Sequence, residues 1–118
     1  MYRVTKRFSF AAAHSLPHLG QLHKCSRLHG HTWHVEITAK AKALDKRGMV
    51  IDFQEFGDVE HYIDECLDHR NLNEVEGLSV PTAENIAKWV WDKAAIRHKN
   101  IERVRVWESE TSWAEYGR

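Results

Sequence analysis

Two stretches of alternating apolar and polar residues, 2–12 and 31–41, constrain the fold of this chain more than any other feature. Successive side chains of a β-strand point to opposite faces, so each stretch would bury one face and expose the other. In the second stretch one face carries a largely apolar series: His31, Trp33, Val35, Ile37 and Ala39. Between the stretches, residues 15–28 have no period and contain a proline and a glycine. We therefore expect two strands joined by a long loop.

Apolar residues at helical spacing predict two helices after these strands. The first pattern, in which Cys66 is expected to lie in the core, consists of Phe53, Phe56, Val59, Ile63, Cys66 and Leu67. Asp52 is its expected N-cap, with Glu55 three residues later as in a capping box. Thr82 is the expected N-cap of the second helix. The buried face of that helix would consist of Ala83, Ile86, Ala87, Val90 and Ala94.

Residues 101–108 and 112–117 predict a third and a fourth strand. The order ββααββ predicts an α+β fold, in which two helices cover one face of an antiparallel four-stranded sheet. Such a sheet has two unpaired edges, and self-association is one way to protect them. With 118 residues, the chain is expected to form one domain, residues 1–118.

Charge and composition exclude several classes of partner. Lys and Arg number 17, as do Asp and Glu, so no basic excess indicates nucleic acid binding. The sequence has no apolar run of membrane-spanning length and no signal peptide, so we expect a cytoplasmic protein with no membrane association. The two cysteines, Cys25 and Cys66, lie in unlike contexts and do not indicate a disulfide framework.

Three histidines predict a metal site. His29 and His31 are two residues apart, so in a strand their side chains lie on the same face. Gly30 between them permits close backbone approach. His14, at the end of the first strand-like run, is the expected third donor. Imidazole nitrogens in this number are typical zinc ligands.

Cys25 leaves two interpretations of this site open. In one, its thiolate is the fourth ligand of a closed structural zinc site. In the other, zinc keeps an open position for substrate oxygens, and Cys25 stands nearby as a thiolate base. Four extended residues would separate Cys25 from His29 by about 13 Å, which favours the second interpretation unless the loop bends back.

Polar side chains at two further places in the sequence are candidates for catalysis or binding. Asp68 and His69 follow the first helix, and a histidine backed by a carboxylate can hold or relay a proton, although adjacent residues rarely pair directly. Glu108 comes at the end of the third strand. Its carboxylate is expected either to face solvent or to accept the paired N–H groups of a guanidine-like heterocycle.

Taken together, these positions resemble the 6-pyruvoyl-tetrahydropterin synthase family, and in particular its bacterial 6-carboxytetrahydropterin synthase (QueD) branch. The resemblance runs from end to end and rests on separated motifs in the family's order: residues 10–14 (FAAAH), 25–31 (CSRLHGH), 50–53 (VIDF), 67–73 (LDHRNLN), 81–85 (PTAEN) and 107–109 (WES). The gap of three residues between Cys25 and His29 resembles the QueD type, whereas the eukaryotic pyruvoyl enzymes have a longer gap.

The resemblance implies the tunnelling fold (T-fold). Three subunits would close a twelve-stranded barrel, and two trimers would stack into a homohexamer with active sites at subunit interfaces. Barrel closure would remove the free sheet edges.

The resemblance also implies the roles of individual residues. One zinc ion per subunit would be held by His14, His29 and His31. Cys25 would accept the proton, and Asp68 with His69 would form a relay that reaches the site from a neighbouring subunit. The pterin ring would be anchored by Glu108, with Thr82 nearby. Candidates for binding the triphosphate are Lys24, Arg27 and Arg70.

The implied activity is that of a zinc-dependent lyase. It would convert 7,8-dihydroneopterin triphosphate to 6-carboxy-5,6,7,8-tetrahydropterin, acetaldehyde and triphosphate, on the route to queuosine and other 7-deazapurines. One alternative is a 6-pyruvoyl-tetrahydropterin synthase, which eliminates triphosphate without losing carbon. Another is a zinc-stabilised oligomeric module without catalysis. A zinc hydrolase is a weaker alternative, because it lacks a general-base glutamate near the histidine pair and leaves Cys25 without a role.

Overall fold

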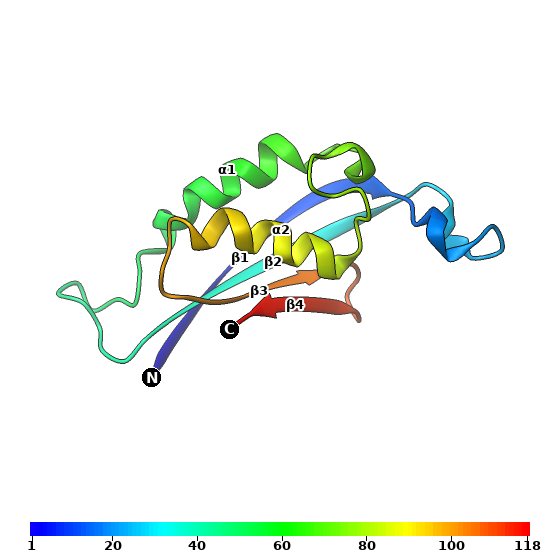
Figure 1. The fold of residues 1–118 in the computed structure, drawn as a ribbon. Coiled ribbons are helices and arrows are strands. Elements are labelled where there is room, and N and C mark those ends of the chain that lie inside the picture. Colours follow the sequence, from blue (N-terminus) through cyan, green and yellow to red (C-terminus); the bar gives the residue numbers. More distant parts are fainter.

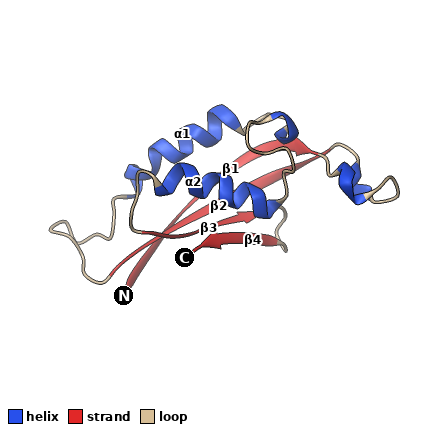
Figure 2. Ribbon diagram, in the orientation of Figure 1, coloured by secondary structure: helices blue, strands red, loops and turns tan.

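The computed structural model describes all 118 residues as an antiparallel four-stranded sheet with two helices on one face (Figures 1 and 2). The elements are β1 (Tyr2–His14), β2 (His29–Ala41), α1 (Gly57–Cys66), α2 (Ala83–Ala95), β3 (Ile101–Trp107) and β4 (Trp113–Gly117). The spatial order of the strands is β1-β2-β3-β4, the same as their order in the chain. The predicted α+β architecture with ββααββ order is confirmed.

The pairing of β1 with β2 extends over the full length of both strands. It runs from Tyr2 opposite Ala41 to His14 opposite His29. β2 therefore begins two residues earlier than the alternation predicts, because His29 completes the ladder with the last residue of β1. This register brings two of the three predicted metal ligands together at one end of the sheet.

The core lies between the helices and the covered face of the sheet. On β2 the predicted apolar face is fully buried: Trp33, Val35, Ile37 and Ala39. The indole nitrogen of Trp33 donates a hydrogen bond of 3.2 Å to the carbonyl of Ala12, so burial leaves this polar atom satisfied. Val104 and Val106 of β3 are buried on the same side, as their spacing predicts.

The start of the first helix differs from the prediction. A short 3₁₀ helix, Phe53–Phe56, precedes α1, which begins only at Gly57. Asp52 caps this 3₁₀ helix by accepting from the N–H of Gln54 at 3.0 Å. The carboxylate of Glu55 pairs with the guanidinium of Arg47, 3.5 Å away, and does not complete a capping box. Glycine is a poor helix former, and its position at the junction divides the expected single helix.

Two residues of the predicted helical stripe lie outside the core. Phe53 is 47% exposed, because it belongs to the 3₁₀ helix, whose tighter winding does not follow the helical period that the sequence pattern assumes. Cys66, expected in the core, is half-buried at the edge of the core.

The second helix agrees with its sequence signals. Thr82 caps α2, because its hydroxyl oxygen accepts a 3.2 Å hydrogen bond from the N–H of Asn85. The helix buries the expected side chains Ile86, Ala87, Val90 and Ala94, and Trp91 as well. Ala83, also expected on this face, is only half-buried, because it is the first residue of the helix and lies at the edge of the core. Both helices of the structure are too short and too polar to cross a bilayer.

The molecule is elongated, with extents of 55 × 24 × 22 Å, and its connections lie at both ends. The loop between β1 and β2 projects beyond the sheet at one end (Figure 1). Two short 3₁₀ helices, Pro17–Leu19 and Lys24–Ser26, form within this predicted loop. Assembly into a barrel remains a prediction.

His98, in the loop after α2, links this loop to the beginning of α1. Its Nε2 lies 3.0 Å from Oδ1 of Asp58, and its ring packs edge-on against Phe56 with centroids 5.1 Å apart. We expect His98→Ala to lower the free energy of unfolding by about 1–2 kcal/mol, because a partly buried carboxylate loses a charge-assisted hydrogen bond. Thermal and urea denaturation measure the change.

Lys88→Ala is the control, since this lysine pairs with Asp92 on the exposed face of α2. Its removal should leave the unfolding midpoint unchanged. Equal midpoints for the two variants and the unmodified protein would contradict a stabilising role for His98.

Candidate metal centre

Four side chains converge where the long strands end. They are His14 of β1, His29 and His31 of β2, and Glu108 directly after β3. One donor atom from each lies within 4.8 Å of the others. The three imidazole rings meet edge to face, with centroids 4.5 to 5.2 Å apart. The histidines that the sequence predicts as ligands are therefore brought together in space.

Two carbonyl groups fix the imidazole rings. Nδ1 of His14 lies 2.8 Å from the carbonyl oxygen of Pro81, and Nδ1 of His29 lies 2.7 Å from that of Arg27. A carbonyl only accepts hydrogen bonds, so both rings carry their proton on Nδ1. The lone pair of Nε2 is then free in both residues. Such bonding is the usual arrangement behind a metal-binding histidine.

Burial favours the neutral form of His14 and His31. His14 is fully buried, and loss of solvation lowers its pKa and that of His31 below the ordinary value. Only a neutral imidazole can donate its lone pair to a metal. Nε2 of His14 and Nε2 of His31 are buried and have no hydrogen-bond partner. An orphaned polar atom of this kind costs about 1–3 kcal/mol, which a bound divalent cation would offset. The donor set therefore fits a metal ion.

Glu108 lies between this donor set and a neighbouring cavity. Its Oε1 is 3.3 Å from Nε2 of both His14 and His31, although neither contact has the geometry of a hydrogen bond. The carboxylate also lines a cavity of about 240 Å³ with Ala83, Glu84, Ser112, Trp113 and Ala114. Glu108 can thus ligate a metal or accept from a molecule in the cavity. Sequence reasoning missed its closeness to the histidines, because that depends on how β3 pairs with β2.

Cys25 shares a cavity with two of the histidines but does not belong to the group of close donor atoms. It lies in the 3₁₀ helix Lys24–Ser26 and is half-buried. Its side chain lines a cavity of about 350 Å³ together with Lys24, Arg27, Leu28, His29 and His31. The group of close donor atoms consists of three histidines and Glu108, and does not include the sulfur. This geometry does not support Cys25 as the fourth ligand of a closed structural site.

Asp68 and His69 form a direct pair, which corrects the expectation that neighbours rarely do so. Nδ1 of His69 lies 2.9 Å from Oδ2 of Asp68. The left-handed backbone of His69, with φ of 57°, lets its ring turn back onto the adjacent carboxylate. Asp68 also accepts from the N–H of Ala11, and these two contacts, the backbone one first, lower the pKa of the carboxyl. The pair lies outside the metal group, and His69 is 81% exposed.

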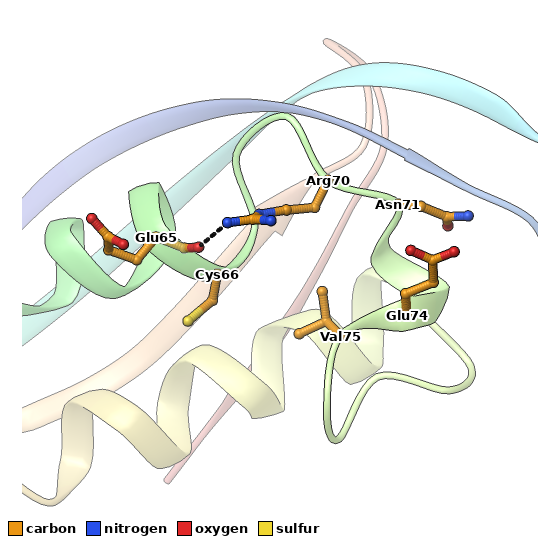
Figure 3. Close-up of a pocket in the computed structure, with 6 residues that line it drawn as sticks. All are labelled: Glu65, Cys66, Arg70, Asn71, Glu74 and Val75. Atoms are coloured by element: carbon orange, nitrogen blue, oxygen red, sulfur yellow. Dashed lines mark hydrogen bonds between the residues drawn. The ribbon is translucent and has the colours of Figure 1, made fainter.

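The remaining predicted positions lie in three different places. Thr82 uses its hydroxyl as a helix cap, and its neighbour Pro81 contacts the site through the carbonyl that holds His14. Arg27 lines the cavity of the thiol. Arg70 lies at another cavity, of about 310 Å³ beside the end of α1, where its guanidinium donates to the carbonyl of Glu65 (Figure 3).

This chain is similar to known proteins over nearly its whole length. The 6-pyruvoyl tetrahydropterin synthase family profile matches residues 3–118. The 6-carboxy-5,6,7,8-tetrahydropterin synthase of Synechocystis sp. is 37% identical over 124 aligned residues, covering 98% of this chain and 93% of the relative. The dihydroneopterin monophosphate aldolase of Pyrococcus furiosus is 34% identical over 112 residues, covering 90% of this chain and 89% of the relative.

A solved structure supports the same fold. The 6-pyruvoyl tetrahydropterin synthase of Caenorhabditis elegans superposes with a TM-score of 0.87 at 23% identity, covering 99% of this chain and 95% of the other. The profile spans nearly the whole sequence, and the relatives are similar over most of their length. This chain belongs to the 6-pyruvoyl tetrahydropterin synthase family.

Proposed function

We propose that this chain is a zinc-dependent 6-carboxy-5,6,7,8-tetrahydropterin synthase, a lyase formed by a single domain of residues 1–118. Its substrates would be 7,8-dihydroneopterin triphosphate and one molecule of water, and its products 6-carboxy-5,6,7,8-tetrahydropterin, acetaldehyde and triphosphate. The observation that carries the proposal is the meeting of three imidazoles, two of which have a buried Nε2 without a hydrogen-bond partner, beside a thiol that shares a cavity with His29 and His31. The name of the Synechocystis relative supports this reaction over others of the family.

Zinc is the ion that best suits these donors. His14, His29 and His31 would hold it, since neutral imidazoles are preferred zinc ligands and three protein ligands leave a position for substrate. When bound, zinc acts as a Lewis acid that makes the side-chain hydroxyls of the substrate and the adjoining C–H more acidic. The carbonyls behind His14 and His29 hold Nδ1 and would leave Nε2 available to a bound ion.

Cys25 is the proposed proton acceptor. As a thiolate it removes a proton from the hydroxyl-bearing carbon of the substrate side chain, and triphosphate leaves. Water then adds to the carbonyl carbon next to the ring, and cleavage of the adjoining carbon–carbon bond leaves the carboxyl group on the ring while the two-carbon fragment takes up a proton and departs as acetaldehyde. Asp68 and His69 would pass protons at the site of a neighbouring subunit, and the high exposure of His69 supports a role outside its own chain.

Glu108 is proposed to hold the pterin ring. The ring presents paired N–H groups, which a carboxylate accepts well. The cavity that Glu108 lines is also lined by Ala83 and Glu84, the two residues that follow Thr82 at the start of α2. Fixing the ring there would place the side chain toward the histidines and make proton transfer a positioned step.

The assembly proposed is a homohexamer of two trimers in the cytoplasm, with queuosine synthesis as the pathway. β1 and β4 form the two edges of the sheet, and pairing of these edges between subunits would close the barrel. Each active site would then combine the metal ligands and Cys25 of one subunit with Asp68 and His69 of another.

Product analysis distinguishes the proposed reaction from its alternatives. With dihydroneopterin triphosphate, we expect equal amounts of 6-carboxytetrahydropterin, acetaldehyde and triphosphate by mass spectrometry and aldehyde trapping. A 6-pyruvoyl product without acetaldehyde would contradict the proposal and indicate a pyruvoyl synthase. Turnover of dihydroneopterin monophosphate alone would favour the aldolase reaction named for the Pyrococcus relative.

Metal analysis distinguishes an open catalytic site from a structural one. Cys25→Ala should retain one zinc per subunit and lose turnover by at least about 100-fold, because the proton acceptor is gone. His31→Ala should weaken zinc binding by at least about 100-fold, because one of three ligands is lost. His34→Ala, on the opposite face of the same strand, is the control and should keep its zinc. Loss of zinc from Cys25→Ala would support the closed structural site.

Arg27 is proposed to bind the triphosphate. It shares the cavity of Cys25, and the net charge of zero means that the anion must be bound by local groups. We expect Arg27→Ala to raise KM about tenfold with little change in kcat, since one charge-assisted contact is worth about 1–2 kcal/mol. Lys46→Ala, in the loop at the far end of the molecule, removes the same charge and should leave KM unchanged. Equal KM values for both variants would exclude the assignment.

A further inference from the structure

A histidine outside the metal group caps the turn that carries Cys25. His23 directly precedes the 3₁₀ helix Lys24–Ser26, and its Nδ1 accepts a hydrogen bond of 3.1 Å from the backbone N–H of Cys25. Because a backbone N–H only donates, Nδ1 must carry the lone pair, and a neutral ring then has its proton on Nε2. This is the opposite tautomer from that of His14 and His29, which donate from Nδ1. The difference separates His23 from the metal ligands in chemical role.

The turn is attached to the metal centre on both sides. The carbonyl of Cys25 accepts a 2.8 Å hydrogen bond from the N–H of Leu16, two residues after His14. On the other side, the carbonyl of Arg27 accepts from the ring of His29. The hydrogen bond that the N–H of Cys25 donates to His23 is the one that the backbone of Cys25 makes with a side chain. Among these contacts, it can be removed without altering a proposed ligand.

The same cap occurs elsewhere in this chain with different residues. Asp52 accepts from the N–H of Gln54 at 3.0 Å, and Asn71 accepts from the N–H of Asn73 at 3.2 Å. Asp52 and Asn71 each cap a 3₁₀ helix by accepting from the N–H two residues later, as His23 accepts from the N–H of Cys25. Aspartate and asparagine are the usual residues for such caps. An asparagine in place of His23 should therefore preserve the hydrogen bond to Cys25.

We propose that His23 is a positioning residue, which holds the turn of Cys25 so that the thiol is aligned with a substrate at the metal centre. The proposal rests on the proposed function, in which Cys25 is the proton acceptor. Proton transfer depends steeply on the distance and alignment of the accepting atom. Freeing the N–H of Cys25 would let the turn move and would slow this step without changing the metal ligands.

Three variants test the proposal in the zinc-loaded protein. His23→Ala removes the acceptor, His23→Asn replaces it, and His18→Ala removes another exposed histidine of the same loop. We expect His23→Ala to lower kcat about fivefold to tenfold, the range that corresponds to losing one cap, with KM and bound zinc unchanged. His23→Asn and His18→Ala should stay within about twofold of the unmodified protein.

A second measurement does not depend on the substrate. The rate of alkylation by iodoacetamide is followed by peptide mass, so that Cys25 is counted separately from Cys66, which serves as the internal reference. We expect alkylation of Cys25 to become about fivefold faster in His23→Ala, because the half-buried thiol gains access when the turn loosens. His23→Asn should restore the original rate.

The outcomes separate this proposal from the proposed function. If alkylation follows the expected pattern but the unmodified protein does not turn over dihydroneopterin triphosphate, the positioning role stands and the assigned reaction fails. If His23→Ala equals the unmodified protein in both kcat and alkylation, the positioning role is overturned. It is also overturned if His23→Asn fails to rescue, or if His23→Ala loses zinc, since His23 would then act in another way.

Discussion

The pairing of His14 with His29 across β1 and β2 is the constraint on which the rest of this site depends. It places one ligand from each strand side by side at the end of the sheet, and His31 follows on the same face of β2. A shift of register by one residue would move every side chain of a strand to the other face. The buried series beginning at Trp33 prevents such a shift, because it would expose the core. The hydrophobic pattern therefore also determines where a metal can bind.

Loop residues orient the histidine rings that the strands bring together. Pro81, before α2, and Arg27, before β2, direct the rings of His14 and His29 through their carbonyls. Both residues also lie next to groups assigned to substrate or catalysis, since Pro81 precedes the cap of α2 and Arg27 lines the cavity of Cys25. The same short segments thus orient the metal ligands and line the space for a substrate.

The sequence predicts the architecture and the three histidines because each depends on a local period. Strand alternation, the cap at Thr82 and the His29–His31 spacing all operate within a few residues. The division of the first helix at Gly57, the half-exposure of Cys66 and the direct Asp68–His69 pair were not predicted. They depend on competition between local caps and on the left-handed backbone of His69, and neither can be inferred from the spacing of apolar residues. The place of Glu108 beside the histidines depends on a pairing between distant strands, which no local pattern encodes.

The central claim is that three imidazoles hold a divalent ion while the sulfur of Cys25 remains uncoordinated. X-ray absorption at the zinc edge of the loaded protein tests it most directly, since zinc–nitrogen bonds are about 2.0–2.1 Å and zinc–sulfur bonds about 2.3 Å. The account predicts a first shell of nitrogen and oxygen alone, unchanged in Cys25→Ala. A sulfur in that shell, lost in the variant, would contradict it.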